Sequence, residues 1–246
     1  MKFHLYIIDR KKASIYAIKF LWIFVLLISI GFISKSTTAA FSIPIRDAIV
    51  VIDAGHGGMD QGASGRSGIT EGKINLKIAF KLRRLIEQNG GVAIMIREDD
   101  RGLYTEGGST GQTKKSEDLR NRHALINSCG ADVFVSIHLN SFPQSQYYGV
   151  QTFYMEGDEE SKKLAESIQN EAIRVLNRGN KRKAKATDSI FILKNNSMPG
   201  VLIECGFLSN LEEERLLDQE HYQEKVAWAI FSGIVKYLEQ EDKTVK

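Results

Sequence analysis

Two histidines and two glutamates stand at positions where a sheet protein usually carries apolar or turn residues. His56 lies in the turn GHGG directly after a short apolar run, and His138 ends another apolar run. Glu204 lies inside the sequence VLIECGFL, where an unpaired carboxylate would be costly to bury. Glu71 begins a helical pattern that follows the His56 turn. These four side chains are therefore the first candidates for a chemical site.

Two imidazoles and one carboxylate form a three-ligand zinc set that leaves a fourth position open for water. A second carboxylate nearby could take the proton of that water while the metal polarises a carbonyl. Each residue alone also has an ordinary interpretation: a plain turn, an acid favoured by a helix dipole, or a structural histidine. Their convergence on one sheet edge favours a shared site, which would be that of a metal-dependent amide hydrolase.

Alternating strand and helix patterns place these residues. This alternation predicts an α/β fold, a single domain with a mostly parallel central sheet flanked by helices. Ligands of such sheets bind beyond the carboxyl ends of the strands, where His56 and His138 lie. Along residues 133–138, alternation places His138 on the same face as Phe134 and Ser136. Strands are expected at 48–53, 92–97, 133–138, 149–155, 190–193 and 201–205, and helices at about 70–89, 116–128, 161–178 and 222–238.

The composition is that of an ordinary globular protein of 246 residues, 43% hydrophobic and 26% charged. The formal net charge is +3, but residues 1–40 alone carry +5, which leaves −2 for the rest of the chain. A weakly acidic body argues against nucleic acid as a partner. Two cysteines are too few for a disulfide scaffold. A long Gly/Ser/Thr-rich loop at 98–115 is predicted to border the site.

The N-terminal segment has the pattern of an export signal. Fourteen uncharged residues, Phe20 to Ile33, follow four basic residues, and Thr38-Ala39-Ala40 offers small residues for cleavage. An uncleaved anchor over about 15–33 is an equal alternative. We therefore expect a signal peptide or signal-anchor with a short linker at 1–40 and the catalytic domain at 41–246. In both cases the catalytic domain is expected to be exported, to the outer face of the cytoplasmic membrane or into the cell wall. We expect it to contact the membrane only through the N-terminal segment.

Four motifs make the pattern specific: IDAGHGGMDQGA, the acid at Glu71, SIHLNS and the late IECGFLSN. In this order, across residues 48–240, they resemble the zinc-dependent N-acetylmuramoyl-L-alanine amidases of the Amidase_3 family. The resemblance implies cleavage of the amide between the lactyl group of N-acetylmuramic acid and the L-alanine of peptidoglycan stem peptides. It also implies one zinc ion per chain, held by His56, Glu71 and His138, with Glu204 as the catalytic acid and base.

The stretch YTEGGSTGQTKKSEDLRNRHALIN, together with the short N-terminal segment and the lone catalytic domain, is similar to the germination-specific amidases of spore formers. That similarity implies action in the spore cortex during sporulation, as a step toward muramic-δ-lactam. It leaves room for an activating protein partner during sporulation, which the sequence does not name. A vegetative, autolysin-type wall amidase is the alternative within the family.

Other residues are weaker candidates. Arg97, Arg120 and Asn140, together with Asp53, are predicted to orient ligands or bind substrate. The basic cluster at 178–185 is either a solvated turn or a contact for stem-peptide carboxylates.

The sequence offers three alternatives to the amidase. Cys205 beside His138 would suggest a cysteine peptidase, but Cys205 is expected to face away from Glu204 as a small buried hydrophobe. A nucleotide-binding domain is excluded because Asp60 stands where the third glycine of that motif belongs. A catalytically silent, membrane-tethered peptidoglycan-binding protein is disfavoured by the intact set of four polar residues.

Overall fold

The computed structural model describes residues 18–25, 45–105, 107 and 111–244. The chain divides into two compact units, residues 1–42 and 43–246. In the first unit residues 18–25 are helical, and the rest of the expected signal or anchor lies outside the described residues. Among the residues that the structure describes, no helix is long and apolar enough to cross a membrane.

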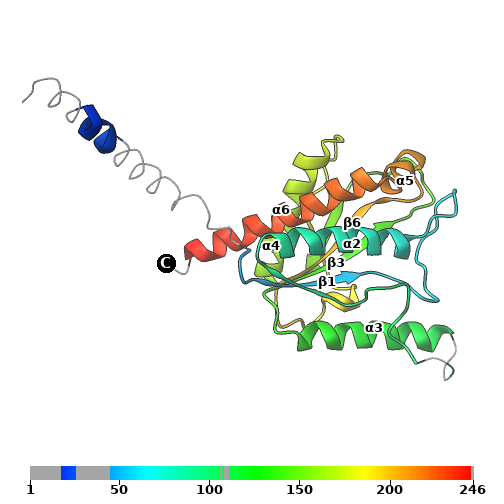
Figure 1. Ribbon diagram of the computed structural model, residues 1–246. Helices are drawn as coiled ribbons and strands as arrows, with labels where there is room; N and C mark the ends of the chain where they lie inside the picture. Colours follow the sequence, from blue (N-terminus) through cyan, green and yellow to red (C-terminus); the bar gives the residue numbers. More distant parts are fainter. Residues whose placement is uncertain (1–17, 26–44, 106, 108–110, 245–246) are drawn as a thin grey trace, which may run out of the picture. The chain divides into compact units, whose positions relative to one another are not determined.

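A six-stranded sheet forms the centre of the second unit, in the order β2-β1-β3-β6-β4-β5 (Figure 1). Parallel pairing joins β1 to β2 and β3, β3 to β6, and β4 to β5, whereas β4 runs antiparallel to β6. The predicted α/β domain with a mostly parallel sheet is therefore confirmed. The strands are β1 (Ile49–Ala54), β2 (Val92–Met95), β3 (Val133–Asn140), β4 (Gln151–Met155), β5 (Lys185–Thr187) and β6 (Gly200–Phe207).

Helices cover both faces of this sheet. One face carries α2 (Glu71–Gln88), α4 (Glu159–Leu176) and α6 (Glu220–Thr244), and α3 (Gly111–Ser128) lies on the opposite face (Figure 1). A single 3₁₀ turn, η1 (Phe191–Leu193), packs beside α3, and the short helix α5 (Leu211–Leu217) follows β6.

Strand β3 separates the two halves of the core. Its residues Val133, Val135 and Ile137 belong to the larger apolar cluster beneath α2, α4 and α6, whereas Phe134 belongs to the smaller cluster beneath α3. This is the alternation predicted from the sequence, and it places His138 on the α3 face of the sheet.

Three predicted elements differ from the structure. The run at 190–193, predicted to be a strand, contains the 3₁₀ turn η1, because so short an apolar run buries Ile192 and Leu193 equally well in either form. Helix α3 begins at Gly111, earlier than predicted. The basic segment around Lys185 forms an edge strand, a place where exposed lysine is common.

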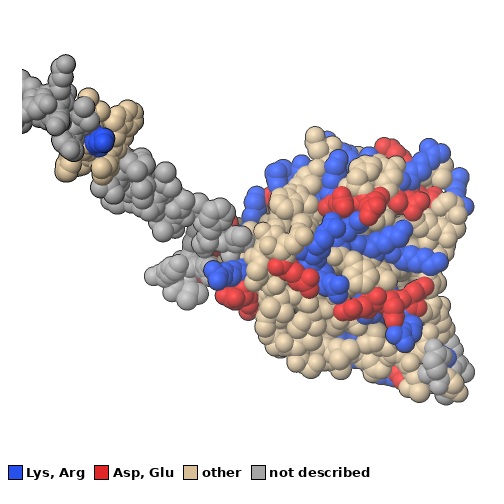
Figure 2. Space-filling model, viewed as in Figure 1, with Lys and Arg blue, Asp and Glu red and all other residues tan. Residues whose placement is uncertain are grey.

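Basic and acidic side chains alternate on the outer surface of α2 and α6 (Figure 2). Lys81 lies 3.1 Å from Glu220, and Arg84 lies 3.4 Å from Glu224, so ion pairs connect the two helices. Pairs as exposed as these contribute at most about 1 kcal/mol each. The packing of the apolar faces, rather than these pairs, therefore holds α2 and α6 together.

Candidate metal centre

Three elements bring the predicted ligands to one edge of the sheet. His56 follows β1 by two residues, His138 lies near the end of β3, and Glu71 is the first residue of α2. Strands β1 and β3 are parallel neighbours with Ala54 opposite Ile137, so their carboxyl ends meet. The adjacency of these strands is what places the two imidazoles together.

The carboxylate of Glu71 lies between the two imidazoles. Its Oε1 is 3.2 Å from His56 Nε2 and 3.0 Å from His138 Nδ1. One ligand atom from each of the three residues lies within 4.8 Å of the others, and both imidazoles line a cavity of about 90 Å³. This is the spacing of a cluster that could hold a metal ion. The structure thus brings the three predicted ligands together.

Backbone groups complete the surroundings of Glu71. Ala63 N–H donates to Oε2 at 2.9 Å, and Leu139 N–H donates to Oε1 at 3.0 Å. Burial opposes ionisation of Glu71, but the hydrogen bonds and charges of His138 and His56 hold its pKa well below the usual range. The same contacts with Glu71 raise the pKa of His138 in spite of its burial. An ionised Glu71 therefore attracts positive charge to the space between the imidazoles. A divalent cation bound by the deprotonated ligands would supply that charge.

Two glycines leave room for these side chains. A Cβ at Gly55 would lie 2.2 Å from His138 Nε2, so the imidazole occupies the space that any other residue would fill. Gly62 has φ +69°, and a Cβ there would lie 2.5 Å from Glu71 Oε2. The glycines of the motif IDAGHGGMDQGA therefore permit the close approach of the ligands.

Asp60 orients His56. Its Oδ2 lies 3.2 Å from His56 Nδ1, and Lys115 Nζ lies 2.8 Å from the same oxygen. A carboxylate on one ring nitrogen fixes the orientation of the imidazole and leaves the other nitrogen free to bind a metal. In this way His56 Nε2 is directed toward Glu71.

A buried arginine on α3 supports the turn that carries His56. Arg122 lies 2.6 Å from Asp53 and 2.7 Å from Asp118, and it donates to the backbone carbonyl of His56 at 2.7 Å. Asp53 also accepts a hydrogen bond from Ser136 Oγ at 2.7 Å. The pKa of Asp53 is lowered because Arg122 and its other partners outweigh the cost of burial. This network joins β1, β3 and α3 directly behind the candidate metal centre.

Arg120 was predicted to bind substrate, whereas the structure gives the buried role on this helix to Arg122. The structure exposes Arg120, whereas Arg122 is 2% exposed. Helical spacing predicts the burial of Arg122, because Leu119, Arg122 and Ile126 fall on one stripe of the helix. A charged residue on an apolar stripe needs a buried partner of opposite charge.

The two other predicted substrate residues occupy different positions. Arg97 is 5% exposed and donates hydrogen bonds of 2.7 to 3.1 Å to the carbonyls of Ala54, Gly55, Gly72 and Asp99. It therefore orients the backbone of the ligand-bearing turn. Asn140 is half-buried at the end of β3, where its side chain accepts from Ser141 N–H. Contact of Arg97, Arg120 or Asn140 with substrate stays a prediction.

Glu204 stands beside the cluster on β6. It is paired in register with His138 across the parallel strands, so both side chains lie on the α3 face. Its Oε2 is buried and has no hydrogen-bond partner among the described residues. Burial raises the pKa of Glu204 to about 7, His138 opposes the shift, and Glu71 adds to it. A carboxyl group whose pKa lies near 7 can both accept a proton and return it at neutral pH.

Cys205, the next residue, points the other way. It is 1% exposed within the larger apolar cluster, and burial raises the pKa of its thiol far above the ordinary value. The prediction that Cys205 faces away from Glu204 is confirmed. A protonated, buried thiol argues against a cysteine nucleophile.

Helix α5, which sequence analysis did not predict, holds two segments that border the site. The carboxylate of Glu213 accepts hydrogen bonds from Phe207 N–H at 2.8 Å and Gly149 N–H at 3.0 Å. The adjacent Glu214 accepts from Ser67 N–H at 2.8 Å. Glu213 and Glu214 thus connect the end of β6 and the loop that carries Ser67 to α5 through hydrogen bonds.

A mostly parallel α/β sheet with two imidazoles and a carboxylate at its carboxyl edge is the architecture of a metal-dependent hydrolase. The chain belongs to the N-acetylmuramoyl-L-alanine amidase family Amidase_3, whose model matches residues 50–236. The chain therefore cleaves the amide between N-acetylmuramic acid and L-alanine, as the motifs predicted. Peptidoglycan, the substrate of this family, lies outside the cytoplasmic membrane, and so does the site of action.

Individual relatives agree with this assignment. The germination-specific N-acetylmuramoyl-L-alanine amidase of Bacillus subtilis is 40% identical over 210 residues, which is 85% of this chain and 88% of the relative. The CwlD amidase of Clostridioides difficile, solved in complex with the GerS lipoprotein, is 51% identical with a TM-score of 0.77 and covers 78% of this chain and 99% of its own. The amidase LytC of Bacillus subtilis is 32% identical over 79% of this chain but only 36% of its own length.

Replacing Arg122 by methionine tests the buried network. The variant leaves the Asp53 carboxylate buried without its charge partner, which costs about 3 to 5 kcal/mol of unfolding free energy. Arg120→Met, on the exposed side of the same helix, is the matched control and should change stability by less than about 0.5 kcal/mol. Urea unfolding of both variants measures the difference. Equal losses for the two variants would contradict the role given to Arg122.

The raised pKa of Glu204 predicts a pH-dependent stability in the metal-free chain. The folded state binds more protons than the unfolded state between the ordinary value of 4.5 and about 7, so the wild type loses stability as pH rises through this range. Glu204→Gln cannot ionise and escapes this loss. Its advantage should grow to the order of 3 kcal/mol above pH 7. Urea unfolding with a chelator present checks this, and parallel pH curves for the two proteins would disprove it.

Proposed function

We propose that the chain binds one zinc ion through His56, Glu71 and His138 and hydrolyses the lactyl–L-alanine amide at that ion. The observation that carries the proposal is the position of the Glu71 carboxylate, 3.2 Å and 3.0 Å from the two imidazoles. Two nitrogen donors and one oxygen donor suit zinc, and three protein ligands leave a position open for chemistry. When bound, zinc supplies a Lewis acid that polarises the lactyl carbonyl and acidifies water.

The chain's own residues supply proton transfer and orientation. Glu204 Oε2, which has no hydrogen-bond partner among the described residues, takes the proton of the attacking water. The same carboxyl group then returns that proton to the departing L-alanine amine, a double role that suits its pKa of about 7. Asp60 holds His56 in its ligating orientation, and Arg97 and Arg122 hold the backbone on either side of it.

The biological setting follows from the relatives. Because a germination-specific amidase matches at 40% identity over most of both chains, the cortex of the spore is the proposed site of action, as a step toward muramic-δ-lactam. The CwlD structure contains a lipoprotein, so a lipoprotein is the proposed kind of activating partner. A vegetative wall amidase is the second candidate, favoured only by the match to LytC.

The proposed domain organisation is an export segment at 1–40, cleaved or retained as an anchor, and a catalytic domain at 41–246. The basic and apolar pattern of the segment supports export, since the substrate is outside the membrane. A silent, membrane-tethered binding protein has less support, because it would have no need of the charged cluster that the fold holds together at a cost.

Two substitutions separate metal binding from proton transfer. Glu204→Ala should lower turnover by at least about a hundredfold and keep one zinc per chain, because it removes the proton acceptor but no ligand. His56→Ala should lose both zinc and turnover. Atomic absorption gives the zinc content, and new L-alanine amino termini released from cortex-type peptidoglycan give the turnover.

The matched control is His221→Ala, which replaces an exposed histidine outside the cluster and should change neither quantity. Normal turnover by Glu204→Ala would remove Glu204 from the mechanism. Normal zinc content in His56→Ala would remove that histidine from the ligand set.

A further inference from the structure

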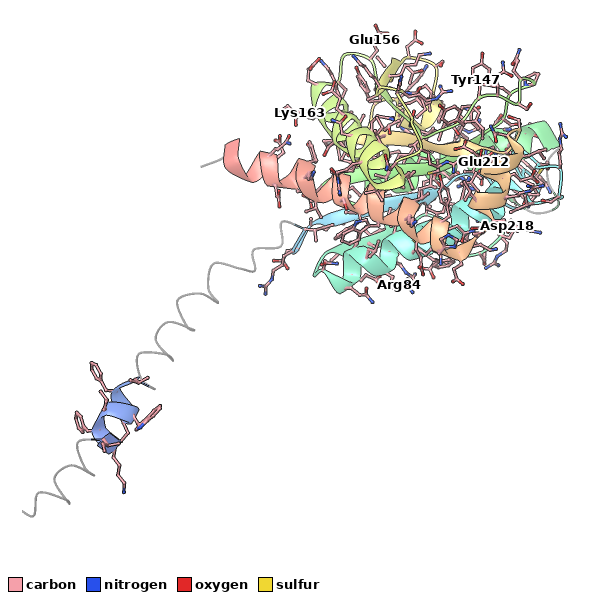
Figure 3. The ribbon with its side chains drawn as sticks, turned by 90° about the horizontal axis from the view of Figure 1, so that it is seen from above. Arg84, Tyr147, Glu156, Lys163, Glu212 and Asp218 are labelled. Atoms are coloured by element: carbon pink, nitrogen blue, oxygen red, sulfur yellow. The ribbon has the colours of Figure 1, made fainter. Side chains whose placement is uncertain are left out.

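A second hollow, of about 430 Å³, lies away from the metal ligands and is lined by residues of the segments 146–148 and 179–182. Two exposed aromatic residues, Tyr147 and Tyr148, line it, with 39% and 42% of their area in solvent. The ring of Phe142, 42% exposed, lies 5.4 Å from that of Tyr147. Tyr147 lies on the same side of the domain as Glu212 of α5 (Figure 3). Nothing in the reaction described above uses this hollow.

A fixed positive charge borders the hollow. The guanidinium of Arg182 stacks over the ring of Phe207 at 4.9 Å and lies 5.9 Å from the ring centroid of Tyr147. Its Nε donates to the Tyr148 carbonyl at 3.1 Å, and its Nη1 donates to Gln151 Oε1 at 3.4 Å. These contacts hold the guanidinium in one orientation before any ligand arrives.

No carboxylate of the described residues forms an ion pair with Arg182. Arg178, from the same basic cluster, differs because it pairs with Glu212 at 2.8 Å. The buried Glu213 directs its carboxylate to the backbone N–H groups of Phe207 and Gly149 instead. Burial raises the pKa of Glu213 and the charge of Arg182 opposes that rise, but the two groups form no ion pair. Arg182 therefore combines fixed geometry with a guanidinium that has no direct carboxylate partner among the described residues, which leaves it able to bind an external anion.

The position of the hollow fits the substrate. Gln151 of β4 lies directly opposite Glu204 of β6 in the antiparallel pair, so both side chains lie on the same face with their Cβ atoms about 5 Å apart. Because Arg182 Nη1 donates to Gln151 Oε1, the guanidinium lies one further side chain away from Glu204. A stem peptide that places its L-alanine at Glu204 and runs across β4 therefore brings the carboxylate of its second or third residue to Arg182, since each extended residue spans about 3.3 to 3.6 Å. In the uncleaved substrate the lactyl carboxyl group is part of the amide, so the glycan at the reacting unit carries no charge for this guanidinium to bind.

We infer that this hollow is the subsite for an anionic residue of the stem peptide, with Arg182 binding its carboxylate. The rings of Tyr147 and Tyr148, which line the hollow, cover the aliphatic part of the same residue. The inference rests on the proposed function, because it assumes that L-alanine is held beside Glu204. It makes Arg182 a determinant of specificity, which distinguishes stem peptides with free carboxylates from those with amidated ones.

Binding of the released peptide tests this without turnover. The zinc-loaded full chain is titrated calorimetrically with a synthetic stem tripeptide that begins with free L-alanine. One form of the peptide has free carboxylates beyond the L-alanine, and the other has them amidated. The wild type should bind the free form about tenfold more tightly, the value of one charge-assisted hydrogen-bonded contact. Arg182→Gln should bind both forms equally, and Arg182→Lys should recover part of the preference.

Arg178→Gln is the matched control, because it removes a neighbouring arginine that already has a carboxylate partner, and it should keep the tenfold preference. Melting temperatures show whether each variant is folded. Equal or undetectable binding of the two peptides by the wild type overturns the inference, as does a preference retained by Arg182→Gln or lost by Arg178→Gln. Loss of the amidase reaction with the preference intact would instead count against the proposed function alone.

Discussion

The buried carboxylate of Glu71 is the group on which the whole site depends. It meets both imidazoles at 3.0 to 3.2 Å and accepts hydrogen bonds from the backbone of Ala63 and Leu139. A buried anion is costly unless positive charge compensates it, and the fold places the two imidazoles directly beside this carboxylate. The same carboxylate joins α2 to the ends of β1 and β3, which makes binding and packing inseparable at this point.

Other contacts keep the surrounding backbone in the position that Glu71 requires. Arg122 and Asp53 form a buried pair behind β1, and Gly55 leaves the space that the His138 ring fills. On the other side, Glu213 and Glu214 tie the end of β6 and the Ser67 loop to α5. Large parts of the chain therefore serve to hold a few polar atoms at fixed separations.

The sequence predicted most of the sheet and the membership of the central cluster. Alternation along β3 was enough to place His138, because the period of a strand assigns each side chain to a face. The helical stripe of α3 indicates that Arg122 is buried, but its partner Asp53 is 69 residues away, so only the folded chain identifies the pair. Helix α5 was missed because seven residues are too few for a periodic signal, and its glutamates acquire their role from backbone N–H groups of distant loops.

The most direct test of this account is the zinc affinity of the chain when Glu71 becomes glutamine. The substitution keeps the size of the side chain and removes the charge that lies between His56 and His138. Competition with a chromophoric chelator measures the affinity of both proteins. The account predicts a loss of at least about a hundredfold. The zinc-free variant should also melt at a lower temperature than the zinc-free wild type, because glutamine keeps only one of the two oxygens that accept from Ala63 and Leu139 N–H. An unchanged zinc affinity would contradict the central place given to Glu71.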